Sequence, residues 1–232
     1  MPLETIISVI IPAHNEADAI AKVIRDVPKS VKEIIVVDNA SSDATSKVAK
    51  EAGATVLFEP KKGYGYACLK GLHYLEQQQE QTDIVVFLDG DYSDYPEELE
   101  KLVAPIIDEN IDFVLGSRTH RLRAQGAMQP QQIFGNWLAT WLMKLFFKSK
   151  FTDLGPFRAI KYSVLKALEM KDKTYGWTVE MQLKILKKKY KYAEIPVHYR
   201  NRIGVSKVSG TLKGSIFAGI KILSWIFKYS FK

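Results

Sequence analysis

Short apolar runs alternate with helical patterns through the first half of the chain. Runs rich in Val and Ile predict buried strands over residues 6–12, 33–37, 54–58, 83–88 and 111–115. Between them, apolar residues at helical spacing predict helices over 17–27, up to 52, and over 67–78 and 96–109. This alternation predicts an α/β fold in which a mostly parallel central sheet is covered by helices on both faces.

The pattern changes after residue 118. A polar loop over 120–130 precedes a helix over 133–147 that is apolar nearly all round. Residues 151–158 are predicted as a loop with a short extended piece. Helices over 162–168 and 178–189, a strand over 192–199, a basic loop over 200–210 and a helix over 211–231 follow. The chain has no internal repeat and no obvious linker, so we expect one domain with a C-terminal helical elaboration.

The composition is that of a globular protein that buries a core. The 232 residues are 47% hydrophobic and 25% charged, with a formal charge of +7. This excess of positive charge is compatible with binding to nucleic acid, anionic lipid or a phosphorylated substrate, but the sequence contains no motif that supports nucleic-acid binding. The single cysteine, Cys68, excludes disulfides within the chain and cysteine-based metal sites. Without a signal-peptide pattern or a run of about 18 apolar residues, we expect a cytoplasmic location and no transmembrane helix.

An acidic pair, Asp89-Gly90-Asp91, directly follows the apolar run 84–88. Two carboxylates so placed can point into the cleft at the carboxyl edge of a parallel sheet, where open α/β sheets bind ligands. Their oxygens suit Mg²⁺ or Mn²⁺, and such a cation could hold a diphosphate. The alternative is that the acids cap the helix that begins near Pro96.

The turn after the first strand excludes three kinds of nucleotide site. Residues 12–16 contain no glycine, whereas a dinucleotide-binding Rossmann unit needs a glycine-rich turn there. A P-loop is also absent, as is the glycine-rich basic loop of a sugar nucleotidyltransferase.

Five motifs in order resemble the family-2 glycosyltransferases of the GT-A fold. They are IIPAHNE at 10–16, VVDNASSDAT at 36–45, LDGD at 88–91, GSR at 116–118 and GVSK at 204–207. The last two resemble the dolichol-phosphate mannose synthase-like branch. The resemblance implies one GT-A domain over 1–232: a nucleotide-sugar-binding half over about 5–118, an acceptor half over about 119–210 and an amphipathic C-terminal helix over 211–232.

The resemblance also implies roles for the matched residues. The nucleotide-sugar would be bound by Pro12, His14, Glu16, Val37 and Asp38. The metal and the diphosphate would be held by Asp89, Gly90 and Asp91, and basic side chains would embrace the phosphates from Arg118, Arg202 and Lys207. The physics agrees, because a cation and fixed guanidinium groups stabilise the charge that builds on a leaving diphosphate.

The chain departs from the family pattern near both the acids and the arginines. Ser93 stands where relatives commonly carry a glutamine metal ligand, which leaves Asp94 as an alternative ligand. The loop before Lys207 is one residue shorter than in many members, so Arg200 competes with Arg202 for the same role.

The acceptor half combines cations with apolar surface. Basic residues gather at Arg118, Arg121, Arg123, Arg158, Arg200, Arg202 and Lys207. The last helix repeats lysines along one face, which is typical of an interfacial helix: Lys213, Lys221, Lys228 and Lys232. We therefore expect inverting, metal-dependent transfer of a hexose from a nucleotide diphosphate-sugar to a polyprenyl phosphate, with peripheral contact at the cytoplasmic membrane face. The alternative for the two apolar helices is packing in the core or in a homodimer interface.

Two other functions are kept as alternatives. A hydroxyl acceptor would need a general base, for which Asp153 and Glu180 are the candidates. A non-catalytic nucleotide-sugar sensor or scaffold is the alternative of another class, and the intact acid pair and basic residues argue against it.

Overall fold

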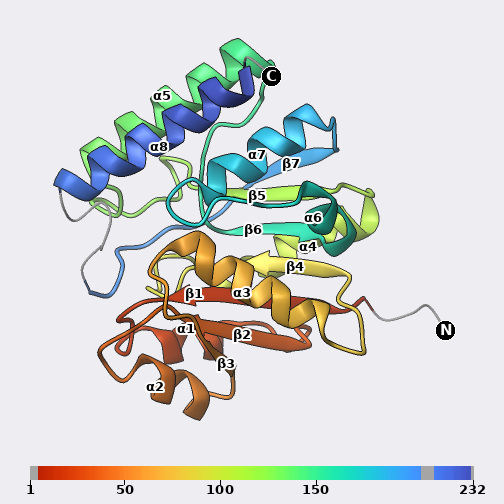
Figure 1. Ribbon diagram of the computed structural model, residues 1–232, viewed down its shortest axis with the longest axis vertical. Helices are drawn as coiled ribbons and strands as arrows, with labels where there is room; N and C mark the ends of the chain where they lie inside the picture. Colours follow the sequence, from red (N-terminus) through yellow and green to blue (C-terminus); the bar gives the residue numbers. More distant parts are fainter. Residues whose placement is uncertain (1–4, 205–211, 231–232) are drawn as a thin grey trace.

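The computed structural model describes residues 5–204 and 212–230 (Figure 1). In this part of the chain, seven strands form one sheet in the order β3-β2-β1-β4-β6-β5-β7. Helices cover both faces of the sheet, which confirms the predicted α/β architecture with a mostly parallel sheet.

Six strands run parallel to one another, and one central strand runs against them. The parallel strands are β1 (Ile7–Ala13), β2 (Glu33–Asp38), β3 (Thr55–Phe58), β4 (Ile84–Phe87), β5 (Phe113–Ser117) and β7 (Tyr192–Pro196). The short strand β6 (Arg158–Lys161) pairs antiparallel with β4 and with β5. The extended piece expected before residue 158 is thus displaced to 158–161. Its central place depends on partners far away in the sequence, which a local pattern does not reveal.

The helices divide between the two faces of the sheet. One face is covered by α1 (Ile20–Asp26), α2 (Thr45–Glu51) and α4 (Leu99–Asp108), the last preceded by a 3-10 turn over Pro96–Glu98. The other is covered by α3 (Tyr64–Glu76), α5 (Pro130–Phe147), α6 (Tyr162–Leu168), α7 (Trp177–Lys187) and α8 (Leu212–Ser230). Figure 1 shows α5 and α8 side by side on this second face, and α8 also contacts α7.

Alternating residues of each strand feed two separate cores. In β1, Val9 and Ile11 pack with α1, α2 and α4, whereas Ile10 packs with the helices of the other face. This follows from the two-residue side-chain period of a strand and explains why both sets are apolar.

Several boundaries differ from the predicted ones because of local chemistry. Helix α5 begins three residues early, where Gln129 and Gln132 form a capping box and Pro130 occupies the first turn. Helix α3 begins at Tyr64 rather than at 67. Pro105 lies within α4, which continues to Asp108.

Candidate active site

Strands β1, β2 and β4 end at the same edge of the sheet, and the loops that follow them begin there. Each contains a non-glycine residue in the left-handed backbone region: Asn15 (φ 55°), Ala40 (φ 57°) and Tyr92 (φ 64°). Such backbone is uncommon and persists only where its surroundings impose it. Asn15, for example, accepts a hydrogen bond from the backbone N–H of Ser42 in the neighbouring loop (2.8 Å). Because open α/β sheets bind ligands at the carboxyl ends of their parallel strands, this edge is the first candidate.

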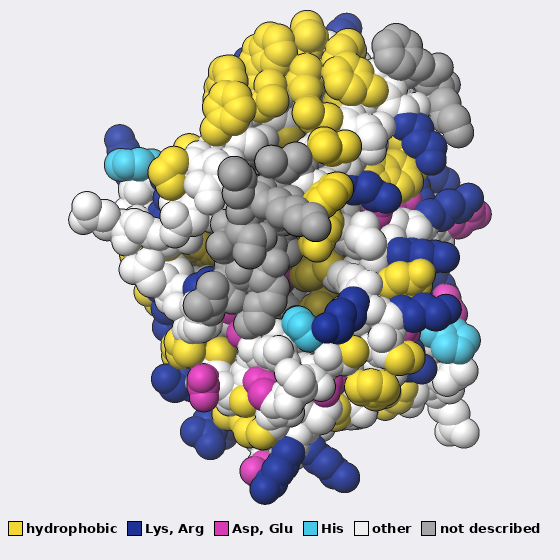
Figure 2. Space-filling view, turned by 60° about the vertical axis from the view of Figure 1, so that its left-hand side comes forward, with side chains coloured by type: hydrophobic (Ala, Val, Ile, Leu, Met, Phe, Trp, Pro, Cys, Tyr) yellow, Lys and Arg dark blue, Asp and Glu magenta, His cyan; other side chains and the backbone are white. Residues whose placement is uncertain are grey.

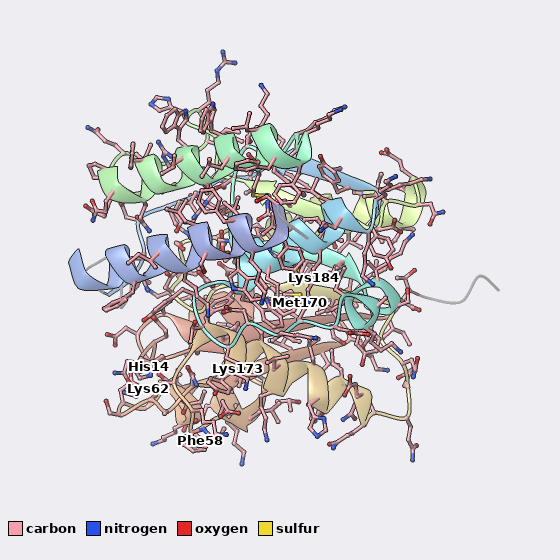
Figure 3. All side chains as sticks on the ribbon, turned by 45° about the horizontal axis from the view of Figure 1, so that its top comes forward. His14, Phe58, Lys62, Met170, Lys173 and Lys184 are labelled. Atoms are coloured by element: carbon pink, nitrogen blue, oxygen red, sulfur yellow. The ribbon has the colours of Figure 1, made fainter. Side chains whose placement is uncertain are left out.

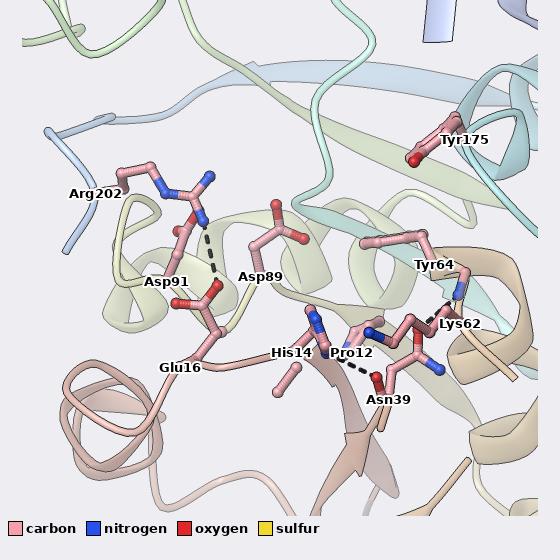
Figure 4. Close-up of a pocket in the computed structure, with 13 residues that line it drawn as sticks. Pro12, His14, Glu16, Asn39, Lys62, Tyr64, Asp89, Asp91, Tyr175 and Arg202 are labelled. Atoms are coloured by element: carbon pink, nitrogen blue, oxygen red, sulfur yellow. Dashed lines mark hydrogen bonds and ion pairs between the residues drawn. The ribbon is translucent and has the colours of Figure 1, made fainter. Parts of the chain in front are cut away.

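A cavity of about 330 Å³ lies at this edge (Figure 4). Its size falls within the range of small-molecule sites, roughly 300–1,000 Å³. Seven of the residues singled out in the sequence line it: Pro12, His14, Glu16, Asp89, Gly90, Asp91 and Arg202. The structure therefore brings Pro12, near the start of the chain, and Arg202, near its end, to the same cavity.

The acid pair meets one guanidinium group. Asp91 accepts hydrogen bonds at Oδ1 from the backbone N–H and the hydroxyl of Ser93 (2.9 and 2.5 Å), and its Oδ2 forms an ion pair with Arg202 (3.0 Å). The Oδ1 atom of Asp89 is buried and has no hydrogen-bond partner in the described part of the chain. Burial and the charge of Asp91 raise the pKa of Asp89 to about 7, although Arg202 opposes the shift. A cation bound beside the two carboxylates would offset the repulsion between their charges, so the pair favours a cation there.

A third acid, Asp94, lies deeper than the pair. It is buried, and neither of its carboxylate oxygens has a hydrogen-bond partner among residues 5–204 and 212–230. Burial and the charges of Asp89 and Asp91 raise its pKa well above the usual range. It does not line the cavity.

Arg200 and Arg202, the two candidates for the phosphate-binding role, lie in different surroundings. Arg202 also reaches the carboxylate of Glu16 (3.3 Å), so its guanidinium stands between two acids of the cavity (Figure 4). The Arg200 guanidinium lies between the rings of Tyr92 (3.6 Å) and Tyr95 (4.0 Å) and donates to a backbone carbonyl of the same segment. Arg200 thus fastens the chain after β7 to the loop after β4, and Arg202 faces the cavity.

The oxygens of Asp89 and Asp91 fit a hard divalent cation such as Mg²⁺ or Mn²⁺. No group of three or more acidic, histidine or cysteine side chains in the described residues is arranged to hold a metal ion by itself. Ser93, at the position of the family's glutamine, donates its hydroxyl proton to Asp91. The protein would therefore supply two carboxylates, and substrate oxygens and water would complete the coordination.

The opposite wall of the cavity is built around Asn39. The Nδ1–H of His14 donates to the Asn39 backbone carbonyl (2.8 Å), and the Asn39 side chain accepts from the backbone N–H of Gly63 (2.7 Å). It also donates to the carbonyls of Glu59 and Lys61 (3.2 and 2.7 Å). Asn39 therefore connects the loop after β2 to the start of α3.

Two residues expected at the nucleotide lie outside the cavity. Asp38 is buried and accepts from the backbone N–H of Ser41 (2.9 Å) and from the hydroxyl of Ser46. Val37 is completely buried within the sheet. In this structure Asp38 holds the turn into α2, and its neighbour Asn39 lines the cavity.

Arg118 and Asp153 form a closed, buried ion pair. The Nε and NH2 groups of Arg118 donate to the two carboxylate oxygens of Asp153 (2.8 and 2.7 Å), and its backbone N–H donates to the same side chain (2.9 Å). Burial alone would raise the pKa of Asp153, but Arg118 holds it below its usual range. Neither residue lines the cavity.

Glu180 is completely buried on α7, away from the cavity lining. Its carboxylate accepts from the backbone N–H groups of Lys171 (3.0 Å) and Asp172 (2.7 Å) and forms an ion pair with Lys184 (2.7 Å). This geometry anchors the loop before α7. Lys207, the last predicted phosphate ligand, lies outside the described residues.

The expectation that Arg158 is available to an acceptor is wrong. Its side chain is completely buried in β6 and donates to the backbone carbonyls of Thr178 (3.0 Å) and Gly155. Burial lowers the pKa of Arg158 to about 10. It supports the loops on either side and is not a surface cation.

Several residues that line the cavity are not among the predicted site residues: Ala13, Asn39, Lys62, Gly63, Tyr64 and Tyr175. The run 61–66 carried a usable signal, because it follows the third parallel strand and so begins at the same edge of the sheet. A Cβ at Gly63 would lie 2.3 Å from the carbonyl oxygen of Lys173, so a side chain does not fit there. Tyr175 reaches the cavity from the loop before α7.

An apolar ridge runs along α5 and α8 on the outside of the molecule. Its members are Phe134, Trp137, Trp141 and Leu145 of α5 and Phe217, Ile220 and Phe227 of α8, which are 42–60% exposed. Figure 2 shows exposed apolar side chains gathered at the top of the molecule, where α5 lies. The spacing of the four α5 residues places them on one helix face.

The two lysines of α8 whose side chains are described, Lys221 and Lys228, lie seven residues apart and so share one helix face, and this face lies partly against the protein. Lys221 turns toward the protein and forms an ion pair with Asp172 (3.1 Å), whereas Lys228 lies over the ring of Trp225 (4.5 Å). The side chains of Lys213 and Lys232 lie outside the described part. None of the helices over 5–204 and 212–230 has the length and apolar character needed to span a bilayer.

Known proteins resemble this chain over nearly its whole length. Residues 8–168 match the model of "Glycosyl transferase family 2". An uncharacterized glycosyltransferase of Mycobacterium tuberculosis is 32% identical over 214 residues, 91% of this chain and 94% of that protein. The undecaprenyl-phosphate mannosyltransferase of Micrococcus luteus is 26% identical over 230 residues, 93% and 92% of the two chains.

A solved structure shares the fold. Glucosyl-3-phosphoglycerate synthase of Mycobacterium tuberculosis, in complex with Mn²⁺, UDP-glucose and phosphoglyceric acid, superposes with a TM-score of 0.78 at 22% identity. The match covers 97% of this chain and 80% of that one. Taken with the family match and the M. tuberculosis relative, this similarity places the cavity on a GT-A sheet. The chain therefore belongs to glycosyl transferase family 2 and is a glycosyltransferase with the GT-A fold.

Proposed function

We propose that this chain is an inverting, metal-dependent hexosyltransferase that moves a hexose from a nucleotide diphosphate-sugar to a polyprenyl phosphate at a membrane surface. One observation carries the proposal. Asp89, Asp91 and Arg202 line one cavity, whereas the two acids that could act as a base for a hydroxyl acceptor, Asp153 and Glu180, are buried and bonded elsewhere.

The acid side of the cavity suits the diphosphate of the donor. Asp89 and Asp91 would hold Mg²⁺ or Mn²⁺, and a cation bound there neutralises charge that builds on the leaving diphosphate. Arg202 would exchange its ion pairs with Asp91 and Glu16 for phosphate oxygens, which its planar guanidinium can bind in pairs. The wall formed by His14 and Asn39 would then contact the nucleoside.

A phosphate acceptor needs no general base from the protein. Its second pKa is about 6, so it is largely ionised near neutral pH. Its oxygen would attack the anomeric carbon on the side opposite the leaving diphosphate, which inverts the configuration of the hexose. A hydroxyl acceptor would have to lose a proton to a nearby side chain. The ion pair of Asp153 with Arg118, which lowers its pKa, makes Asp153 a poor base.

The apolar ridge supports a lipid-borne acceptor. Exposed aromatic and aliphatic side chains on one side of a helix pair suit the interfacial region of a bilayer. The relative from M. luteus is named for the use of undecaprenyl phosphate, an acceptor of this class. We infer peripheral membrane contact through the ridge on the same grounds.

A panel assay tests the proposal. The purified chain is mixed with UDP-, GDP- and other nucleotide-sugars, a short-chain polyprenyl phosphate and Mn²⁺ or Mg²⁺, and both nucleoside diphosphate and lipid-linked sugar are measured. We expect one donor to give equal amounts of the two products, and no product with EDTA. Parallel reactions with phosphoglyceric acid, which is bound in the M. tuberculosis structure, represent a hydroxyl acceptor. Product with phosphoglyceric acid alone would overturn the proposal, and donor binding without turnover would favour a sensor.

A further inference from the structure

Asp172 joins α8 to the loop between α6 and α7. The residue is 2% exposed, and its two carboxylate oxygens face different elements. Oδ1 accepts from the backbone N–H groups of Thr174 (2.7 Å) and Gly176 (3.0 Å) in the loop. Oδ2 accepts from the indole Nε1–H of Trp225 (2.7 Å) and forms an ion pair with Lys221 (3.1 Å), both on α8. One buried carboxylate therefore holds the loop and the helix together.

The same loop is fastened to the start of α3 on its other side. The backbone N–H groups of Gly65 and Tyr66 donate to loop carbonyls (3.3 and 3.0 Å). A Cβ at Gly65 would lie 2.1 Å from the carbonyl oxygen of Asp172, so the close contact requires glycine. Tyr175 of the loop and Tyr64 of α3 both line the cavity. Two of its walls are thus joined to each other by backbone hydrogen bonds.

The connection runs from the molecular surface to the cavity. Figure 3 shows Lys173 where the loop passes between α8 and α3; His14 and Lys62, labelled in the same view, line the cavity. Trp225 and Lys221 do not line the cavity themselves. The exposed ridge residues Ile220 and Phe227 project from a neighbouring side of α8, about 100° round the helix from Lys221, so the same helix carries part of the ridge and the contacts to Asp172.

We propose that Asp172 is a positioning residue for the donor: it transmits the placement of α8 to the cavity walls that carry Tyr175 and Tyr64. A membrane surface that covers the ridge then favours the arrangement of walls that binds the donor. This last step rests on the proposed function, whereas the link from α8 to the cavity does not depend on the acceptor.

The contacts allow the link to be broken on α8, at residues that do not line the cavity. Trp225→Phe keeps an aromatic ring but removes the N–H that Asp172 accepts, and Lys221→Met keeps the aliphatic stem but removes the charge. The matched control is Ser224→Ala, which removes an exposed hydroxyl from the same helix and leaves Asp172 untouched.

Amide hydrogen exchange and binding of UDP and of GDP with Mn²⁺ test the link. In Trp225→Phe and Lys221→Met, we expect faster exchange at Gly65 and Tyr66, about fivefold weaker binding of the diphosphate that the wild type prefers, and a higher donor KM with an unchanged acceptor KM. Ser224→Ala should match the wild type. If exchange at Gly65 and Tyr66 and diphosphate affinity stay at wild-type values, even with a lower Tm, the coupling is refuted. The exchange measurement needs no acceptor, so it tests the coupling even if polyprenyl phosphate fails as a substrate.

Discussion

The acids of the cavity and the acids behind it differ in how completely they are paired. Asp89 leaves one carboxylate oxygen without a hydrogen-bond partner among the described residues, and Asp91 forms its ion pair with the Arg202 guanidinium, which itself faces the cavity. In contrast, the carboxylates of Asp153 and Glu180 each accept hydrogen bonds from backbone N–H groups and each form an ion pair with a buried cation. The first pair is therefore arranged to receive a ligand, and the second pair stabilises loops.

The largest effect is expected at Asp91. Asp91→Asn removes the charge that faces Arg202 and the expected cation, so turnover of the donor should fall by about 10³-fold while the protein remains folded. Steady-state kinetics and circular dichroism measure the two quantities. Glu97→Gln, an exposed acid a few residues along, serves as control and should keep wild-type turnover. Full activity in Asp91→Asn would remove the cavity acids from the mechanism.

Asp153→Asn should act on stability. It leaves the buried Arg118 guanidinium without its carboxylate, which should lower the free energy of unfolding by about 3–5 kcal/mol at pH 7. Because the folded-state pKa of Asp153 is depressed, its stabilisation is present above the unfolded pKa, about 3.9, and is lost as the pH falls through the folded value. The difference between variant and wild type should therefore shrink below about pH 4.

Urea denaturation at pH 7 and pH 3 measures this difference, with the exposed Asp108→Asn as control. An Asp153→Asn variant that is as stable as the wild type but has lost turnover would instead make Asp153 the base for a hydroxyl acceptor.

Arg202→Gln should change two affinities in opposite directions. The donor KM should rise by about tenfold, because a charged contact to the diphosphate is lost. Binding of Mn²⁺ without nucleotide should become tighter, because Asp91 and Glu16 no longer share a guanidinium. Electron paramagnetic resonance titration of Mn²⁺ measures the second effect, with the exposed Arg121→Gln as control. Weaker Mn²⁺ binding in Arg202→Gln would show that Arg202 does not compete with the cation.

The smallest effect is expected on the apolar ridge. Replacing Trp137 and Trp141 by Ser should weaken binding to anionic phospholipid vesicles by about tenfold and leave nucleotide affinity unchanged. Vesicle sedimentation measures the change. Ile107→Ser, an exposed apolar residue on α4 and thus on the other face of the sheet, is the control. If the variant instead alters the oligomeric state in solution, the ridge is a dimer interface.

The periodic elements and one half of the cavity could be predicted from the sequence. Parallel strands bring their carboxyl ends to one edge, so His14, Glu16 and the acids after β4 are expected to meet. The central place of strand β6 could not be predicted, because four residues give little pattern and its partners lie far away in the chain.

The pairing of buried charges could not be predicted from the sequence either. Arg118 and Asp153 are 35 residues apart, and their motifs predict separate catalytic roles, although their side chains bond each other. Tyr175 lies in a loop that is held by hydrogen bonds to the carboxylates of Asp172 and Glu180. Such contacts depend on tertiary structure, and local residue patterns do not encode them.

The proposed function has a phosphate acceptor, because neither candidate base, Asp153 or Glu180, faces the cavity. The most direct measurement compares the rate of hexose transfer to a short-chain polyprenyl phosphate and to the corresponding polyprenol, with the preferred donor and Mn²⁺. We expect transfer to the phosphate, with inversion at the anomeric carbon, and no detectable transfer to the alcohol. Transfer to the alcohol at an equal or higher rate would contradict the proposed function.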